Sequence, residues 1–98
     1  MTVSNEERCI KILNEICKEH FDQDEYSLRG PKESAVCLEK TSSGWNVYEN
    51  ERNSHNDSFL FDNVIEAGLD LLKRLSDTVD YNVLKNQFFD AILSQRIA

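Results

Sequence analysis

Glu49 and Glu51 are the residues of this chain whose spacing is best suited to acid–base chemistry. They stand two positions apart in a predicted strand, so both side chains project from one sheet face, with Cα atoms about 6.8 Å apart. Hydrolysis by two carboxylates also needs a large substrate cleft. An enzyme built on this pair is therefore one hypothesis. A solvated strand end and a carboxylate pair that faces a protein partner are the alternatives.

The three cysteines and two histidines form no catalytic or metal-binding pattern. Cys9 and Cys17 lie eight residues apart on a predicted helix, about 12 Å, which is too far for a disulfide. Cys37 lies between two apolar residues of a predicted strand. The chain has no C-x-x-C or H-x-x-x-H spacing, and its three glycines form no phosphate-binding loop. We expect no catalytic residue, cofactor or metal, and three buried cysteines in a reducing compartment.

Three helices are predicted, one near the beginning of the chain and two near its end. Ser4 and Glu7 have the spacing of a capping box, and apolar residues then recur at the helical period. Gly68 lies inside the second helix, where glycine costs about 1 kcal/mol relative to alanine, so we expect a close approach to the sheet or to another helix. The predicted helices cover 4–20, the stretch from Asp62 or Asn63 to Ser76–Asp77, and the stretch that Asp80 caps.

Short β-rich runs lie between the first two helices. Trp45 and Val47 share one face of a strand, so we expect Trp45 to anchor the core. Tyr48 projects from the opposite face and is predicted to be a surface aromatic residue. Residues 53–58 are predicted to be a polar loop. The predicted strands cover 26–29, 35–40, 45–52 and, as a short strand or helix entry, 59–61.

This order of elements predicts the α+β class. We expect residues 1–98 to form a single domain in which an antiparallel sheet of three or four strands is packed by an N-terminal helix and two C-terminal helices.

The balance of acidic and basic residues limits the kinds of partner that the chain could bind. The 98 residues include 18 acidic and 11 basic side chains, for a net charge of −7. A general nucleic-acid or anionic-membrane binder would carry a basic surface instead. The chain shows neither a secretory signal nor a stretch long and apolar enough to span a membrane, so we expect a cytoplasmic protein. Acidic residues gather in a connector, 19–25, and along a hairpin end and loop, 49–57.

Residues 44–52 read GWNVYENER, and a polar stretch, Phe59 and a helix with the pair Glu66-Ala67 follow. This arrangement resembles small immunity proteins of bacterial polymorphic toxin systems, including those of contact-dependent growth inhibition. Their pattern is a W-x-V-x-x-x-E-R-G strand, a loop, a phenylalanine and a helix with an E-A pair. The likeness covers about a quarter of the chain. It departs from the pattern at Asn53, where glycine is usual, although asparagine also adopts positive φ.

The resemblance implies a non-enzymatic inhibitor that binds the C-terminal toxin domain of its own system. Such toxins are often nucleases with basic clefts, which an acidic binder complements. It would bind no nucleic acid directly and would be a monomer or a weak homodimer. The alternative is an acidic regulatory or adaptor module that dimerises through an exposed sheet edge. The candidate partner contacts are Tyr48, Glu49, Glu51, His55 and Asp57, with Asp22, Asp24 and Glu25 as a second patch.

Overall fold

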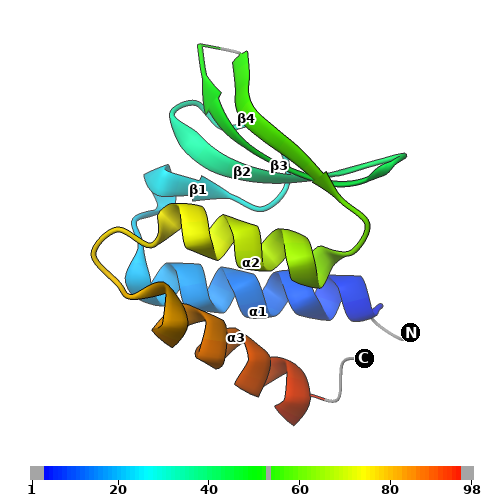
Figure 1. The fold of residues 1–98 in the computed structure, drawn as a ribbon, viewed down its shortest axis with the longest axis vertical. Coiled ribbons are helices and arrows are strands. Elements are labelled where there is room, and N and C mark those ends of the chain that lie inside the picture. Colours follow the sequence, from blue (N-terminus) through cyan, green and yellow to red (C-terminus); the bar gives the residue numbers. More distant parts are fainter. Residues whose placement is uncertain (1–3, 53, 96–98) are drawn as a thin grey trace.

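This computed structural model describes residues 4–52 and 54–95. Over these residues a four-stranded sheet and three α-helices form two layers, with all three α-helices on one side of the sheet (Figure 1). The architecture confirms the predicted α+β class and the predicted places of the three helices. In chain order the elements are α1 (Asn5–His20), the short 3-10 helix η1 (Gln23–Glu25), β1 (Tyr26–Ser27), β2 (Ala35–Thr41), β3 (Gly44–Glu51), β4 (Ser54–Phe61), α2 (Val64–Leu75) and α3 (Tyr81–Ser94).

Each of the three α-helices is preceded by a residue whose side chain caps it. Ser4 Oγ accepts a hydrogen bond of 3.1 Å from the N–H of Glu7. Asn63 Oδ1 does the same for α2 at 2.9 Å, and Asp80 Oδ1 for α3 at 2.9 Å. These bonds satisfy backbone donors that no residue inside the helix can reach, so the predicted caps are confirmed, with Asn63 rather than Asp62 at α2.

The sheet is mixed, with the strand order β1-β2-β3-β4. The strands β2, β3 and β4 are antiparallel, as predicted, whereas β1 is parallel to β2. The parallel pairing follows from residues 28–34, which carry the chain back across the sheet. Gly30, with φ +111°, donates its N–H to Leu38, and Ser34, with φ +60°, donates to the carbonyl of Asn50. This return brings η1 to the beginning of β2.

The predicted polar loop at 53–58 is wrong, because residues 54–58 belong to β4. At this edge of the sheet seven of the eight residues of β4 are exposed, so the strand lacks the apolar alternation by which strands are predicted. Its pairing with β3 is irregular, because Asp57 and Ser58 both lie opposite Tyr48 and Asp57 has φ +50°. Asn53, where the turn was expected, lies outside the described residues.

The main core lies between the sheet and the helices. Trp45 is 6% exposed and donates its indole N–H to Glu6 of α1 at 3.1 Å, so its predicted role as an anchor is confirmed. A Cβ added to Gly68 would lie 2.9 Å from Leu13 Cδ1 and 3.1 Å from Phe88 Cζ, which confirms the predicted close approach. Three helices therefore meet at this glycine.

Candidate functional site

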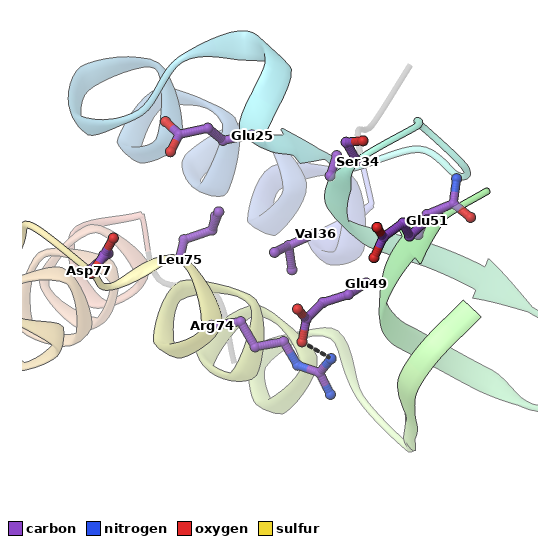
Figure 2. A pocket seen from close by; sticks show the side chains of 10 residues that line it. Glu25, Ser34, Val36, Glu49, Glu51, Arg74, Leu75 and Asp77 are labelled. Atoms are coloured by element: carbon purple, nitrogen blue, oxygen red, sulfur yellow. Dashed lines mark ion pairs between the residues drawn. The ribbon is translucent and has the colours of Figure 1, made fainter. Parts of the chain in front are cut away.

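An open pocket of about 410 Å³ lies where β2 begins, β3 ends and α2 ends (Figure 2). Val36 and Leu75 lie in the middle of the view. Glu49 and Glu51 lie to one side of them, and Glu25 and Asp77 lie to the other. The full lining is Glu25, Ser34, Ala35, Val36, Glu49, Asn50, Glu51, Arg74, Leu75 and Asp77. An apolar centre between carboxylates suits a side chain with an apolar stem and a cationic end.

The pocket joins the two acidic segments of the sequence. Glu25 belongs to the 19–25 connector, and Glu49 and Glu51 belong to the hairpin end, yet all three line one pocket. Asp22 and Asp24 are exposed on the same connector but do not line it. Asp22 instead donates its backbone N–H to the carboxylate of Glu25 at 2.8 Å. We name the group Glu25, Glu49, Glu51 and Asp77 the acidic pocket.

Arg74 is the one cationic side chain in the pocket lining. Its Nε donates to Asp70 Oδ2 at 2.9 Å, and its Nη1 lies 3.6 Å from Glu49 Oε2. Its Nη2 donates to the carbonyl oxygen of Asp57 at 2.5 Å. The side chain is only 16% exposed, so these contacts fix it between α2, β3 and β4. Four carboxylates and one guanidinium leave the pocket acidic.

The candidate partner contacts predicted on the hairpin lie on two different faces of the sheet. Glu49 and Glu51 lie on the helix side, which confirms that they share a face (Figure 2). Tyr48 and His55 lie on the other side, with ring centroids 3.9 Å apart and planes at 15°. Asp57 is exposed at the irregularity of β4. One flat partner surface therefore cannot cover all five residues without bending around the hairpin.

Tyr48 is not the surface aromatic residue that the alternation predicted. Its exposed fraction is 0%, because the imidazole of His55 covers the ring and Cys37 lies beside it. Its hydroxyl donates to Glu39 at 2.7 Å. Burial, followed by this carboxylate acceptor, raises the pKa of the Tyr48 hydroxyl. Tyr48 thus belongs to a small second core on the sheet face away from the helices.

The cysteines are buried and free, as predicted. Burial raises the pKa of the Cys9 thiol to about 11 and that of Cys17 to about 12. Burial also raises the pKa of Cys37. A thiol is a poor nucleophile when its pKa is raised in this way.

Residues 4–52 and 54–95 contain no group of three or more His, Cys, Asp or Glu side chains that could hold a metal ion. Within these residues, no helix has both the length and the apolar character that a membrane span needs.

The sequence reasoning missed Arg74 and Asp77. Asp70 and Arg74 stand at the i, i+4 spacing of a helical ion pair, and this signal could have identified the arginine as a fixed side chain. Asp77 follows the end of α2, and no local pattern marks it. An open pocket does lie beside Glu49 and Glu51, so the acid–base interpretation of this pair stays a hypothesis.

Comparisons with protein-family models, with curated proteins and with solved structures found no match for this chain.

Proposed function

We propose that this chain is a bacterial immunity protein that binds and neutralises a cognate toxin domain without catalysis. The observation that carries the proposal is the acidic pocket, in which Glu25, Glu49 and Glu51 come together from two separate acidic segments. Surfaces of opposite electrostatic potential speed the association of two proteins and disfavour binding of other partners. The partner is accordingly a basic protein, and a nuclease domain with a basic cleft fits this description.

The likeness of residues 44–52, Phe59 and Glu66-Ala67 to polymorphic toxin immunity proteins supports the same proposal. In the structure this stretch is β3, β4 and the first turn of α2, and three of its residues, Glu49, Asn50 and Glu51 of β3, line the pocket. The surface of the described protein is 6249 Å². A standard interface covers about 800 Å² per partner, so the chain is large enough to present one. We place the proposed protein in the cytoplasm, where its toxin would act.

Growth protection tests the proposal. We expect a large secreted protein to be encoded directly upstream of this chain, and the toxin candidate is the C-terminal domain of that protein, expressed from an inducible promoter in a sensitive bacterium. We expect growth to stop when the domain is expressed alone and to continue when the chain is co-expressed. The variant Glu49→Gln/Glu51→Gln removes both charges but keeps the shapes of the side chains, and it should protect less well than the wild type.

Asp90→Asn is the matched control, because Asp90 is an exposed acid on α3 outside the pocket. It should protect as the wild type does. A chain that gives no protection although both proteins accumulate would contradict the proposed function. An acidic adaptor protein, which is the alternative function, would give no protection in this test.

A further inference from the structure

β4 is the last strand of the sheet, so its outer edge has no neighbouring strand among the described residues (Figure 1). The carbonyl of Asn50 faces β2, where it accepts the N–H of Ser34. Along an antiparallel strand, the backbone N–H and carbonyl of successive residues point alternately toward one neighbouring strand and the other. The backbone groups of Val47 therefore point toward β4 and bond to its partner, Phe59. Leu60, the next residue of β4, therefore directs its N–H and carbonyl outward. The edge offers a donor and an acceptor to a further strand.

The same stretch of β4 exposes large apolar side chains on both faces. Phe59 is 58% exposed and Leu60 is 47% exposed. Phe61 lies against Phe59, with ring centroids 4.7 Å apart. Natural sheets commonly protect an open edge with charged side chains, proline or a β-bulge. In β4 the charge and the irregularity both lie at Asp57, so residues 59–61 carry none of these protections. The apolar side chains and free backbone groups thus lie where an added strand would use both.

The charges around this edge favour a basic occupant over a second copy of the chain. Asp57 and Asp62 flank the apolar residues, and both are exposed. Residues opposite each other in an antiparallel pair either both face the partner or both face away, so a second copy could pair Leu60 with Leu60 but not with Phe59. That copy would bring its own Asp57 and Asp62, and a net charge of −7, to an edge that is already acidic. A strand with lysine or arginine near its ends would bring opposite charges to the edge instead.

We propose that the edge Ser58–Phe61 docks an extended strand of a protein partner, with apolar residues at its centre and basic residues at its ends. This inference rests on the proposed function. The toxin domain would be recognised by adding one of its strands to the sheet of this chain. Arg74 already donates to the carbonyl of Asp57, so the added strand pairs only with residues after Asp57.

The test uses the full chain and two synthetic peptides, acetyl-Lys-Thr-Val-Thr-Val-Thr-Lys-amide and the same peptide with glutamate in place of both lysines. NMR measures amide hydrogen exchange of the chain at millimolar peptide. We expect the lysine peptide to slow exchange of the Leu60 amide about tenfold, because that N–H gains an acceptor. The glutamate peptide should leave it unchanged. Leu60→Pro removes the outward N–H together with the exposed leucine side chain and should abolish binding, whereas Leu93→Ser, which removes an exposed leucine of α3, should not.

Three results would overturn the proposal. The first is an unchanged Leu60 amide with the lysine peptide, and the second is equal effects of the two peptides. The third is a dimer in sedimentation equilibrium that Leu60→Pro abolishes, because the edge would then hold a second copy. These peptides need no toxin, so the result is separate from the growth test. Full growth protection by Leu60→Pro would remove the edge from the interface and leave the proposed function standing.

Discussion

Tyr48 is held by contacts at its ring and at its hydroxyl. His55 stacks on the ring, and Glu39 accepts the hydroxyl hydrogen bond at 2.7 Å. A buried tyrosine needs such a partner, because an unpaired hydroxyl would lose its hydrogen bonds to water. The residue thus stabilises the far face of the sheet, and the surface aromatic group at this position is the imidazole of His55.

Tyr48→Phe should lower the free energy of unfolding by about 1 kcal/mol, because it removes one hydrogen bond and keeps the ring. Urea denaturation measures this change. The affinity for the partner should stay the same, since the hydroxyl does not reach the surface. An unchanged stability together with a weakened affinity would show instead that Tyr48 is a contact residue.

At the scale of the elements, Glu6 connects α1 to two strands. Its carboxylate lies 2.5 Å from Lys40 Nζ and 3.1 Å from Trp45 Nε1. The hydrogen bond from Lys40, followed by that from Trp45, lowers the pKa of Glu6. A lowered folded-state pKa contributes stability above the unfolded-state value, and this contribution is lost as the pH falls through the folded-state value.

Glu6→Gln should therefore destabilise the protein at pH 7 by about 0.5 kcal/mol, a small value because the carboxylate is partly exposed. The difference from the wild type should shrink as the pH falls below the ordinary value of 4.5. Thermal unfolding at pH 7 and pH 3 measures it. A difference that grows in acid would contradict the assigned contacts.

Gly68 determines how closely α2 packs against the other helices. Alanine would gain about 1 kcal/mol of helix propensity, but its Cβ would lie 2.9 Å from Leu13 and 3.1 Å from Phe88, both fully buried. Overpacking of this kind costs about 1–3 kcal/mol. Gly68→Ala should therefore lower the midpoint of urea denaturation. A raised midpoint would mean that the core has room at this contact.

The helices were predictable because their signals are local. Caps such as Ser4 and Asp80, together with the helical period of apolar residues, predict them without any knowledge of distant contacts. β4 was largely missed because an edge strand exposed on both faces carries no apolar alternation. That Glu49 and Glu51 share a face could be predicted from the two-residue period of a strand. That Glu25 lies in the same pocket could not be predicted, because its position depends on the parallel pairing of β1 with β2.

At the scale of the whole molecule, the net charge of −7 becomes informative once it is placed on the surface. Four acids gather around one pocket between the sheet and α2, and Asp57 and Asp62 lie by the free edge of β4. Screening by salt weakens attraction between exposed charges. We therefore expect the association rate with a basic partner to fall as ionic strength rises.

Isothermal titration calorimetry of this chain with its purified toxin domain, the expected product of the upstream gene, measures whether the acidic pocket binds the partner. We expect Glu25→Lys/Glu49→Lys/Glu51→Lys to weaken binding at least about a hundredfold, since each reversal opposes a basic surface. Asp90→Lys should bind as the wild type does. Equal affinity of the triple variant and the wild type, with both folded, would contradict the claim that the acidic pocket binds the partner.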